Sequence, residues 1–432
     1  MSEQIASSTD VHAIKARVHS LLLERLDFSV MAVGEQETIH SQLSILIMQI
    51  LEELGAALTV AELQQVVREI RHDVLGLGPL EVLLEDPTVS DILVNSHRQI
   101  YVERRGKLEQ TDQRFRDDQH LREVIEKIVS AVGRRIDESS PMVDARLPDG
   151  SRVNAIVPPL AIDGPILSIR KFNKNMLTLE DLVRMHALTA GIGELLTGIV
   201  RARLSVVISG GTGSGKTTML NLLSGFIPAT ERIVTIEDSA ELQLRQDHVL
   251  RLETRMANIE GKGEVTQRAL VRNSLRMRPD RIIMGEVRSD EALDMLQAMN
   301  TGHDGSLATV HANTPQDAVA RIETMVAMGG LDIPPHAVRQ QIASAIQVII
   351  QVQRLSDGSR KLISLQEMHG LTDGEIELRE IFKFEQVGLG DQGRVKGRFR
   401  ATGVVPAFVD RLNVRGFAVS KDLFDPRQVE DC

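Results

Sequence analysis

VVISGGTGSGKTTMLNLL, residues 206–223, joins an apolar run to a cluster of glycines, a lysine and two threonines, and then to a second apolar run. The residues from 210 to 217 fit the pattern G-x-x-x-x-G-K-[ST]. We expect a buried strand over 204–209 and a helix over 218–226, which is the context that the pattern requires. Strand, glycine loop and helix together predict a site for the phosphates of a nucleotide.

Each part of this loop has a physical role in binding phosphate. Glycines let the backbone curl so that successive N–H groups point at phosphate oxygens, and the helix N-terminus adds partial positive charge. Lys216 is predicted to reach the β- and γ-phosphates, and the Thr217 hydroxyl to bind Mg²⁺. A flexible Gly/Ser turn is the alternative, and the complete pattern favours the phosphate site. The predicted binding residues are Gly210, Gly211, Thr212, Gly213, Ser214, Gly215, Lys216, Thr217 and Thr218.

Composition limits the classes of protein to which this chain can belong. At 432 residues it is long enough for two or three domains, and 42% hydrophobic with 25% charged residues is typical of a soluble globular protein. The apolar run 43–51 is too short to span a bilayer, and the N-terminal stretch MSEQIASSTD does not resemble a secretory signal. The one cysteine, Cys432, allows no internal disulfide, which fits a reducing compartment. We therefore expect a cytoplasmic protein.

The charge balance bears on nucleic-acid binding. The formal net charge is −10, whereas proteins that bind DNA or RNA through many phosphates usually carry a basic excess. Aromatic residues make up 3% of the chain and tryptophan is absent, so side chains on which bases could stack are scarce. No specific nucleic-acid partner is expected, although a locally basic groove stays open.

The N-terminal part of the chain, residues 1–75, is expected to be a helical segment used for packing or docking. Apolar residues recur at helical spacing over 39–54. A second helix is expected to begin at Thr59, because Glu62 three residues later completes a capping box.

Two further regions differ from the first in the secondary structure that their sequences predict. Residues 76–173 read as short strands around one helix, which predicts an α+β domain with a sheet of its own. A linker, residues 174–176, precedes a region, 177–432, in which strands and helices alternate. This alternation predicts an α/β domain, with helices packed about a largely parallel sheet.

Hydrolysis of a bound triphosphate requires Mg²⁺, an aligned water and neutralised charge, and three stretches offer suitable residues. In the first, TIEDSAEL, Glu237, Asp238 and Glu241 stand at the end of a strand that we expect to run beside the loop strand. Carboxylates at the C-termini of strands in an open α/β sheet lie where ligands bind. A solvated acidic turn that caps the next helix is the alternative, and this stretch alone favours neither.

The second stretch, RIIMGEV, is an apolar strand that ends in Glu286. An acid in this place commonly holds Mg²⁺, and the usual residue is an aspartate after four apolar residues. Here Gly285 and Glu286 stand instead. Ion pairing with Arg288 is the alternative, and the phosphate loop upstream favours the magnesium role.

The third stretch, NTGHDGSLATVHANT, contains His303 and His311. Two histidines with no cysteine and no H-E-x-x-H pattern make a poor zinc site. His311 stands at the end of the strand that follows the Glu286 strand. It is either a structural histidine or a residue that senses the γ-phosphate or positions the attacking water.

Four stretches follow one another along the chain: GGTGSGKTT, TIEDSAEL, RMRPDRIIMGEVR and NTGHDGSLATVHANT. They resemble the phosphate loop, Asp box, Walker B and His box of the secretion ATPases, the hexameric motors of type II and type IV secretion and of type IV pili. With DARLPDGSRVNAIVPP upstream, the chain is most similar to the tight-adherence (Flp/Tad) pilus ATPases of the CpaF type. The resemblance covers about residues 77–367. It implies a RecA-like P-loop NTPase domain, preceded by an α+β (PAS-like) domain and a helical segment.

The resemblance also implies roles for single residues. Glu241 matches the glutamate proposed in this family as the base that activates water. Glu237 and Asp238 would support this base and Mg²⁺. Glu286 matches the Walker B glutamate and His311 the His-box histidine.

Family members further send arginines from the N-terminal domain onto the nucleotide at the domain interface. The matching positions are Arg152 in DGSRVNAI and Arg170 in LSIRKF, with Arg146 as a weaker candidate. Such an arginine neutralises charge that builds on the γ-phosphate, so closure of two domains would trigger turnover. Surface ion pairing is the alternative for these arginines.

The sequence therefore predicts an ATPase that uses ATP and Mg²⁺, forms a homohexamer and drives an inner-membrane pilus or secretion platform from the cytoplasmic face. A RecA-class nucleic-acid translocase, a small-molecule kinase and a slow nucleotide-gated regulatory module are the alternatives. The charge and aromatic content count against the first, and the domain before the loop fits the second poorly. GTP is not expected, because no N-K-x-D base-reading motif follows the loop.

Overall fold

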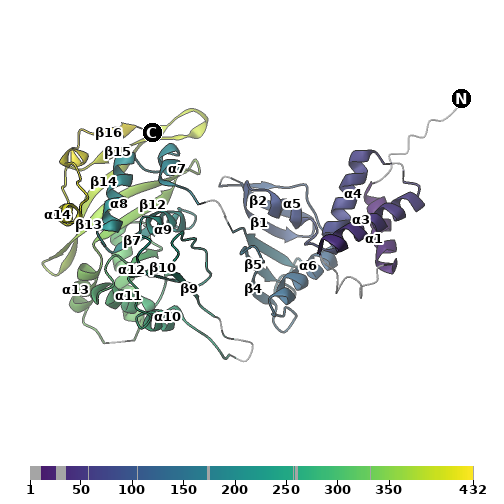
Figure 1. Cartoon of the computed structure of the whole chain (residues 1–432), viewed down its shortest axis with the longest axis horizontal. Coiled ribbons are helices and arrows are strands. Elements are labelled where there is room, and N and C mark those ends of the chain that lie inside the picture. The colour runs from purple at the N-terminus through teal and green to yellow at the C-terminus, as the bar shows by residue number, and fades with distance from the viewer. Residues whose placement is uncertain are drawn as a thin grey trace. The chain divides into compact units, whose positions relative to one another are not determined.

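The structure is a computed structural model that describes residues 11–25, 36–56, 58–104, 106–172, 176–255, 257, 261–330 and 332–431. The chain divides into two compact units, Met1–Phe172 and Asn173–Cys432 (Figure 1). The division falls next to the predicted linker, most of which lies outside the described residues, as do residues 1–10 and 26–35 of the predicted helical segment. In the described part of the chain, no helix is both long enough and apolar enough to span a bilayer.

The first unit begins with three helices that pack on one another: α1 (Val11–Arg25), α3 (Gln36–Glu53) and α4 (Val60–Val74). Their apolar faces bury a small core that includes Leu22, Ile47 and Ile70. The Thr59 hydroxyl accepts a hydrogen bond from the Glu62 amide, and the Glu62 carboxylate accepts one from the Thr59 amide. The predicted capping box at the start of α4 is therefore confirmed.

The rest of the first unit is a six-stranded antiparallel sheet with two helices. Its strands are β1 (Val89–Ser96), β2 (Gln99–Arg104), β3 (Lys107–Gln110), β4 (Met142–Arg146), β5 (Arg152–Ile156) and β6 (Ile166–Arg170). They lie in the order β3-β2-β1-β6-β5-β4. The helices are α5 (Leu80–Glu85) and α6 (Asp118–Ala131), and the buried face of α6 contributes Leu121 and Ile125 to a core shared with the sheet. This is the α+β architecture that the strand and helix pattern predicts.

A lysine ties the helical segment to the sheet domain. The Lys127 ammonium on α6 donates to the backbone oxygens of Leu75 and Gly76 at 2.8 Å each, and to that of Val74 at 3.3 Å. These are carbonyls at the end of α4, where the helix leaves them without partners and where its dipole favours a cation. Burial lowers the pKa of Lys127.

The second unit contains a ten-stranded sheet in the order β16-β15-β14-β13-β12-β7-β11-β10-β8-β9 (Figure 1). The parallel part consists of β12 (Val348–Arg354), β7 (Val206–Gly210), β11 (Leu307–Val310), β10 (Arg281–Val287), β8 (Ile233–Glu237) and β9 (Val249–Glu253). Antiparallel strands extend it beyond β12: β13 (Arg360–Thr372), β14 (Glu375–Leu389), β15 (Val395–Ala401) and β16 (Val429–Asp431).

Helices cover both faces of this sheet. Side chains of β7 alternate between two cores: Val206 and Ile208 lie in one, and Val207 lies in the other. The first core is closed by residues of α7 (Leu179–Arg184), α8 (Ala190–Arg201), α9 (Lys216–Gly225) and α14 (Val409–Val414). The second is closed by residues of α10 (Gln267–Ser274), α11 (Glu291–Asn300), α12 (Pro315–Met328) and α13 (Pro335–Ala345). The predicted α/β class is confirmed.

One expectation about strand order was wrong. The strand that ends in Glu237, β8, does not run beside the loop strand β7, because β11 and β10 lie between them. A helical crossover can skip positions in a sheet, and buried parallel strands carry similar apolar runs, so the sequence does not specify which of them are neighbours.

Candidate nucleotide-binding and catalytic site

The phosphate loop has the backbone that the glycine pattern predicts. β7 ends at Gly210, and α9 begins at Lys216. Gly215 has a φ of +100°, a left-handed backbone conformation that residues other than glycine rarely adopt. A Cβ on Gly210 would stand 2.6 Å from the backbone oxygen of Val352 and 2.4 Å from the Ser214 hydroxyl. Glycine at these two positions is therefore required by close approach and by backbone conformation.

The Lys216 side chain folds over the loop. Its ammonium donates to the carbonyl oxygens of Gly210 at 3.0 Å and Gly211 at 2.9 Å. Burial lowers the pKa of Lys216; the Glu286 carboxylate acts to raise it and the Arg288 guanidinium to lower it. The lysine thus shares an electrostatic environment with the end of β10.

Because the six central strands run parallel, their carboxyl ends meet at one edge of the sheet. This edge holds the phosphate loop after β7, Glu286 near the end of β10, and His311 just after β11. The segment with His311 is fixed to the neighbouring strands, since the Gln351 amide and the Ser209 hydroxyl donate to the Ala312 carbonyl at 3.2 and 3.5 Å. The predicted residues of the second unit therefore collect where ligands of open α/β sheets bind.

The acidic stretch after β8 reaches α9 even though β8 is remote from β7. The Gln243 amide donates to the Asn221 side chain on α9 at 2.9 Å. The Gln246 side chain donates to the backbone oxygens of Ser224 and Ile227 at the end of the same helix. The stretch that contains Glu241 is thereby tied to the helix that follows the phosphate loop.

The buried Glu237 side chain holds the backbone of the stretch after β8. Its side chain is buried, and its Oε2 atom accepts from the amides of Glu241 at 2.7 Å and Leu242 at 2.9 Å. Burial raises its pKa, and the Oε1 atom has no hydrogen-bond partner among the described residues. A Cβ on Gly285 would stand 2.9 Å from Glu237 Cγ, which explains the glycine before Glu286.

An arginine joins the acids of β8 and β10. Arg288 donates through Nη1 to Asp238 at 3.0 Å and through Nε to Glu286 at 2.9 Å. The other Asp238 oxygen accepts from the Gln267 amide at 2.8 Å. The pairing of Glu286 with Arg288, which the sequence offered as the alternative, is thus present, and the carboxylate still lies close enough to Lys216 to affect its pKa.

The residues at this edge fit a nucleotide with Mg²⁺. The loop supplies backbone N–H groups and an ammonium for phosphate, and the exposed Thr217 lies in the first turn of the helix beside them. Asp238 and Glu286 supply carboxylate oxygens, the ligands that Mg²⁺ prefers, and Mg²⁺ usually takes one or two of these with phosphate and water. The donor set therefore matches this ion.

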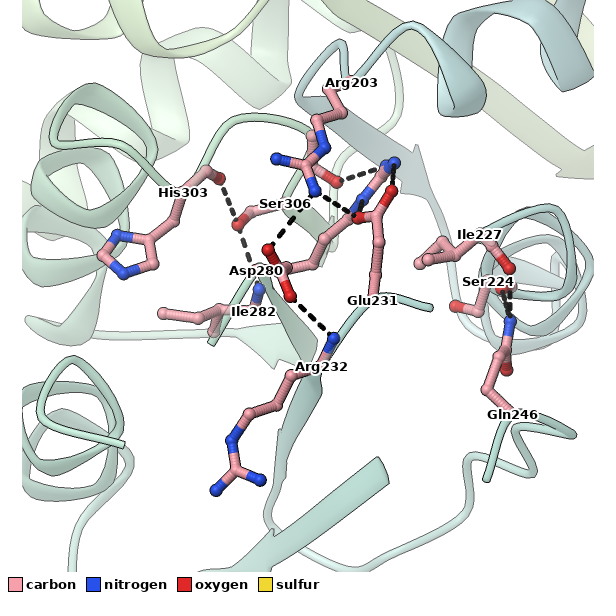
Figure 2. A network of polar contacts seen from close by, with 12 residues as sticks. Arg203, Ser224, Ile227, Glu231, Arg232, Gln246, Asp280, Ile282, His303 and Ser306 are labelled. Carbon is pink, nitrogen blue, oxygen red and sulfur yellow. Dashed lines mark hydrogen bonds and ion pairs between the residues drawn. The ribbon is translucent and has the colours of Figure 1, made fainter. Parts of the chain in front are cut away.

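The second histidine of the third stretch lies elsewhere. His303 precedes β11 while His311 follows it, so the strand separates the two residues. The His303 carbonyl accepts from the Ser306 hydroxyl, which in turn accepts from the Ile282 amide (Figure 2). His303 therefore belongs to the amino-terminal edge of the sheet, and a zinc site shared with His311 is excluded by the fold.

That edge is held by a buried ion pair. Arg281 is fully buried and donates to both carboxylate oxygens of Glu231, at 2.7 and 3.2 Å, and to the Gly305 carbonyl at 3.1 Å. Arg203 lies between Glu231 and Asp280, at 3.2 and 3.3 Å (Figure 2). These contacts join the starts of the strands whose other ends form the site.

In the first unit, the three predicted arginines form one row. Arg146 on β4 stands opposite Arg152 on β5, which stands opposite Arg170 on β6. Arg170 also pairs with Asp91 on β1, at 3.1 Å. Like charges directly opposite one another repel, and Asp91 offsets part of this repulsion at Arg170.

Two arginines near the phosphate loop escaped the sequence analysis. Arg354 and Arg360 flank the predicted Asp357-Gly358 turn, and both side chains lie beside the loop. The turn signal was visible in the sequence. Nothing in it indicated that the strand before the turn would border β7.

Comparison with known proteins shows the family to which the chain is similar. The family described as type II/IV secretion system protein matches residues 73–410. A Mycobacterium tuberculosis protein whose name refers to conjugal transfer is 41% identical over 305 residues, covering 69% of this chain and 86% of its own. The type IV secretion system protein VirB11 of Brucella suis is 31% identical over 316 residues, covering 67% and 88%.

A solved structure is also similar. It is the VirB11 ATPase from the Brucella suis type IV secretion system in complex with sulphate, with 28% sequence identity, 67% of this chain and 95% of that chain covered, and a TM-score of 0.37. Together with the phosphate loop and the acids gathered beside it, the family match identifies the chain: it belongs to the type II/IV secretion system protein family, the secretion ATPases, and is a P-loop ATPase.

Proposed function

We propose that this ATPase is a homohexameric motor that powers assembly of a Flp/Tad-type pilus, or type II/IV secretion, at the cytoplasmic face of an inner membrane. The observation that carries the proposal is the meeting of the phosphate loop, Lys216, Glu286 and His311 at one edge of a parallel sheet. The sequence resemblance to the Flp/Tad ATPases supports the pilus assignment, and the names of the relatives support secretion or conjugal transfer as the setting.

The residues of the second unit divide the chemistry among themselves. Lys216 and the loop N–H groups hold the β- and γ-phosphates. Glu241 accepts the proton of the attacking water. Glu237 positions Glu241, because its carboxylate accepts hydrogen bonds from the Glu241 and Leu242 amides. His311 orients the water or senses the γ-phosphate.

Mg²⁺, when bound, neutralises charge on the phosphates and polarises them toward attack. Thr217, Asp238 and Glu286 are the residues that would hold it. Glu237 is a weaker candidate for direct contact, because its carboxylate is buried and already accepts two backbone amides. The Arg288 guanidinium holds Asp238 and Glu286 together and so keeps both carboxylates near the loop.

The arginine row of the first unit supplies the remaining positive charge. We propose that Arg152 and Arg170 approach the γ-phosphate when the two units close, with Arg146 at the margin. The alignment of three arginines on neighbouring strands supports an anion-binding role for the row, because guanidinium groups bind phosphate oxygens. Repeated closure and opening would pass the motion to a membrane-embedded platform through protein partners.

Turnover and mass measurements on the purified chain test this proposal. Lys216→Ala should abolish ATP hydrolysis, because the loop loses its ammonium. Glu241→Ala should still bind ATP but lose hydrolysis, because binding does not use the general base. The wild-type assembly should have the mass of six subunits. Unchanged turnover in both variants would defeat the assignment.

The same assay separates the alternatives. A nucleic-acid translocase would hydrolyse ATP faster when DNA is added, and we expect no such stimulation from a chain with a net charge of −10. A regulatory module would bind ATP and release phosphate only slowly, with or without partners. Turnover that a reconstituted membrane platform accelerates would support the motor.

A further inference from the structure

A hairpin brings two arginines to the phosphate loop from the side opposite the acids. β12 lies on one side of β7, whereas β11, β10 and β8 lie on the other. Val352 of β12 pairs with Gly210, so Arg354 stands just beyond the start of the loop. Arg360, at the start of β13, stands directly opposite Arg354.

The Arg360 side chain contacts the loop, and the Arg354 side chain lies beside it. The Arg360 Nε atom donates to the Gly213 carbonyl at 2.9 Å, and Arg360 Cδ lies 3.4 Å from the place of a Cβ on Gly215. The Arg354 Nη1 atom lies 3.6 Å from the place of a Cβ on Gly213. The bond from Arg360 fixes the orientation of the Gly213 peptide plane, and so the direction of the N–H groups that face an anion.

The turn that carries these arginines is fixed. The Leu355 amide donates to the Ser359 carbonyl at 2.7 Å. The Asp357 carboxylate accepts from the Ser359 amide at 2.9 Å and, through its other oxygen, from the Val395 amide of β15 at 2.8 Å. The Asp357 carboxylate therefore stabilises the turn and connects it to β15.

Two guanidinium groups at paired positions place two positive charges side by side, next to the loop. A phosphate loop binds an anion. Arginine presents planar donors that match phosphate oxygens in pairs, which lysine does not. The position, the contacts and the charge of the hairpin all point to the same ligand.

We propose that Arg354 binds the nucleotide's phosphates from the side away from Mg²⁺, and that Arg360 positions the loop through Gly213. This proposal rests on the proposed ATP site and extends it, because it assigns phosphate-binding groups to both sides of the phosphate loop. On the β10 side, the charge of Glu286, a candidate metal ligand, acts on Lys216. On the β12 side, the hairpin offers cations alone to the phosphate oxygens that the metal leaves free.

The proposal is tested by measuring ADP binding to the full-length protein by calorimetry. EDTA in the buffer removes metal ions, and ADP is used so that no hydrolysis takes place. Arg354→Gln should weaken ADP binding about 10- to 100-fold, because a charge-assisted hydrogen bond to phosphate is lost. The ADP affinity of Arg354→Lys should lie between those of the wild type and Arg354→Gln, since lysine keeps the positive charge but not the paired planar donors of a guanidinium. If Arg354→Gln does not fold, a clear loss in Arg354→Lys still supports the proposal and wild-type affinity still overturns it.

Arg360 should behave differently. Both Arg360→Gln and Arg360→Lys should weaken ADP binding by similar factors, because neither retains the Nε–H bond to Gly213. Arg379→Gln is the matched control. This exposed arginine on β14 pairs with Glu377 and stands opposite Glu367 of β13, toward the opposite edge of the same sheet. It should bind ADP as the wild type does.

Kinetics with Mg²⁺ add a second readout. The phosphates that Arg354 contacts are bound in both the ground and the transition state, so Arg354→Gln should raise KM and leave kcat nearly unchanged. A variant that binds ADP as tightly as Arg379→Gln, or that loses kcat at unchanged KM, overturns the proposal. A wild-type protein that binds no ADP would instead refute the ATP site itself, so the two failures are distinguishable.

Discussion

For Glu237 we propose a role in catalysis that does not require its side chain to face the substrate. Its carboxylate is buried at the end of β8, and one oxygen receives two backbone amides from the stretch that contains Glu241. Burying a carboxylate is costly unless its hydrogen bonds are satisfied, and here one oxygen has no partner among the described residues. The residue is thus retained at a cost, which fits a role in holding the proposed base.

Substitutions at Glu237 separate this positioning role from direct magnesium binding. Glu237→Gln keeps an oxygen that can accept both amides, so kcat should stay within about threefold of the wild type. Glu237→Ala removes the acceptor, and kcat should fall about 10- to 100-fold, as is usual when the support of a catalytic group is lost. Steady-state ATPase assays measure both.

The opposite result has a clear meaning. If Glu237→Gln is as inactive as Glu237→Ala, the negative charge itself is needed and the residue is a metal ligand. Glu380→Gln, on β14 away from the site, serves as the control for loss of one carboxylate charge; its side chain accepts from the Ser364 hydroxyl.

At the level of strands and loops, the amino-terminal edge of the second unit is held by ionic contacts rather than by apolar packing alone. Arg281 begins β10, Glu231 precedes β8, and Gly305 precedes β11. A Cβ on Gly305 would stand 2.6 Å from the Arg281 guanidinium, so the glycine in the sequence TGHDGS is required by packing. This part of the third stretch is structural, whereas its other end carries His311.

Removing Glu231 should therefore destabilise the second unit strongly. Glu231→Ala leaves the guanidinium of Arg281 buried without its carboxylate, and loss of one partner of a buried pair costs about 3–5 kcal/mol. Urea denaturation measures the free energy of unfolding. The control is Glu375→Ala, whose carboxylate is 72% exposed and pairs with Arg339, and which should cost less than about 1 kcal/mol.

A loss in Glu231→Ala no larger than in Glu375→Ala would show that the pair contributes little. Glu231 also pairs with Arg203, at 3.2 Å. Both arginines would then lose the same acceptor.

At the level of the whole molecule, the proposed motor needs residues from both units. The second unit contains the phosphate loop and the acids, whereas the three-arginine row belongs to the first. Neither unit alone holds every group that the proposed hydrolysis uses. Turnover should therefore depend on closure, and nucleotide binding much less so.

Arg152→Gln tests this division. If Arg152 neutralises charge that builds on the γ-phosphate during reaction, kcat should fall about 10³-fold or more, the usual effect of losing such an arginine. The affinity for ADP, which has no γ-phosphate, should stay within about threefold of the wild type. Calorimetry and ATPase assays provide the two numbers.

Arg122→Gln is the matched control in the same unit, because Arg122 on α6 pairs with Glu126 four residues later on the surface. It should leave both quantities unchanged. An Arg152→Gln variant with normal kcat would assign the row to ordinary ion pairing, the alternative that the sequence left open.

The sequence by itself determined the features that depend on neighbouring residues. The phosphate loop, the capping box at Thr59 and the boundaries of β10 follow from residues within one short stretch, because their hydrogen bonds and backbone conformations are local. The α/β class followed as well, from the alternation of strands and helices.

Only the tertiary structure decided which strands are neighbours. The buried strands β7, β8, β10, β11 and β12 all carry apolar runs, so their sequences permit many orders, and burial of both faces selects one. That order separates β8 from β7 and sets Arg354 and Arg360 beside the loop. In the first unit, the separate order β6-β5-β4 aligns Arg146, Arg152 and Arg170 in a row. These placements depend on contacts between residues far apart in the chain, which no local pattern encodes.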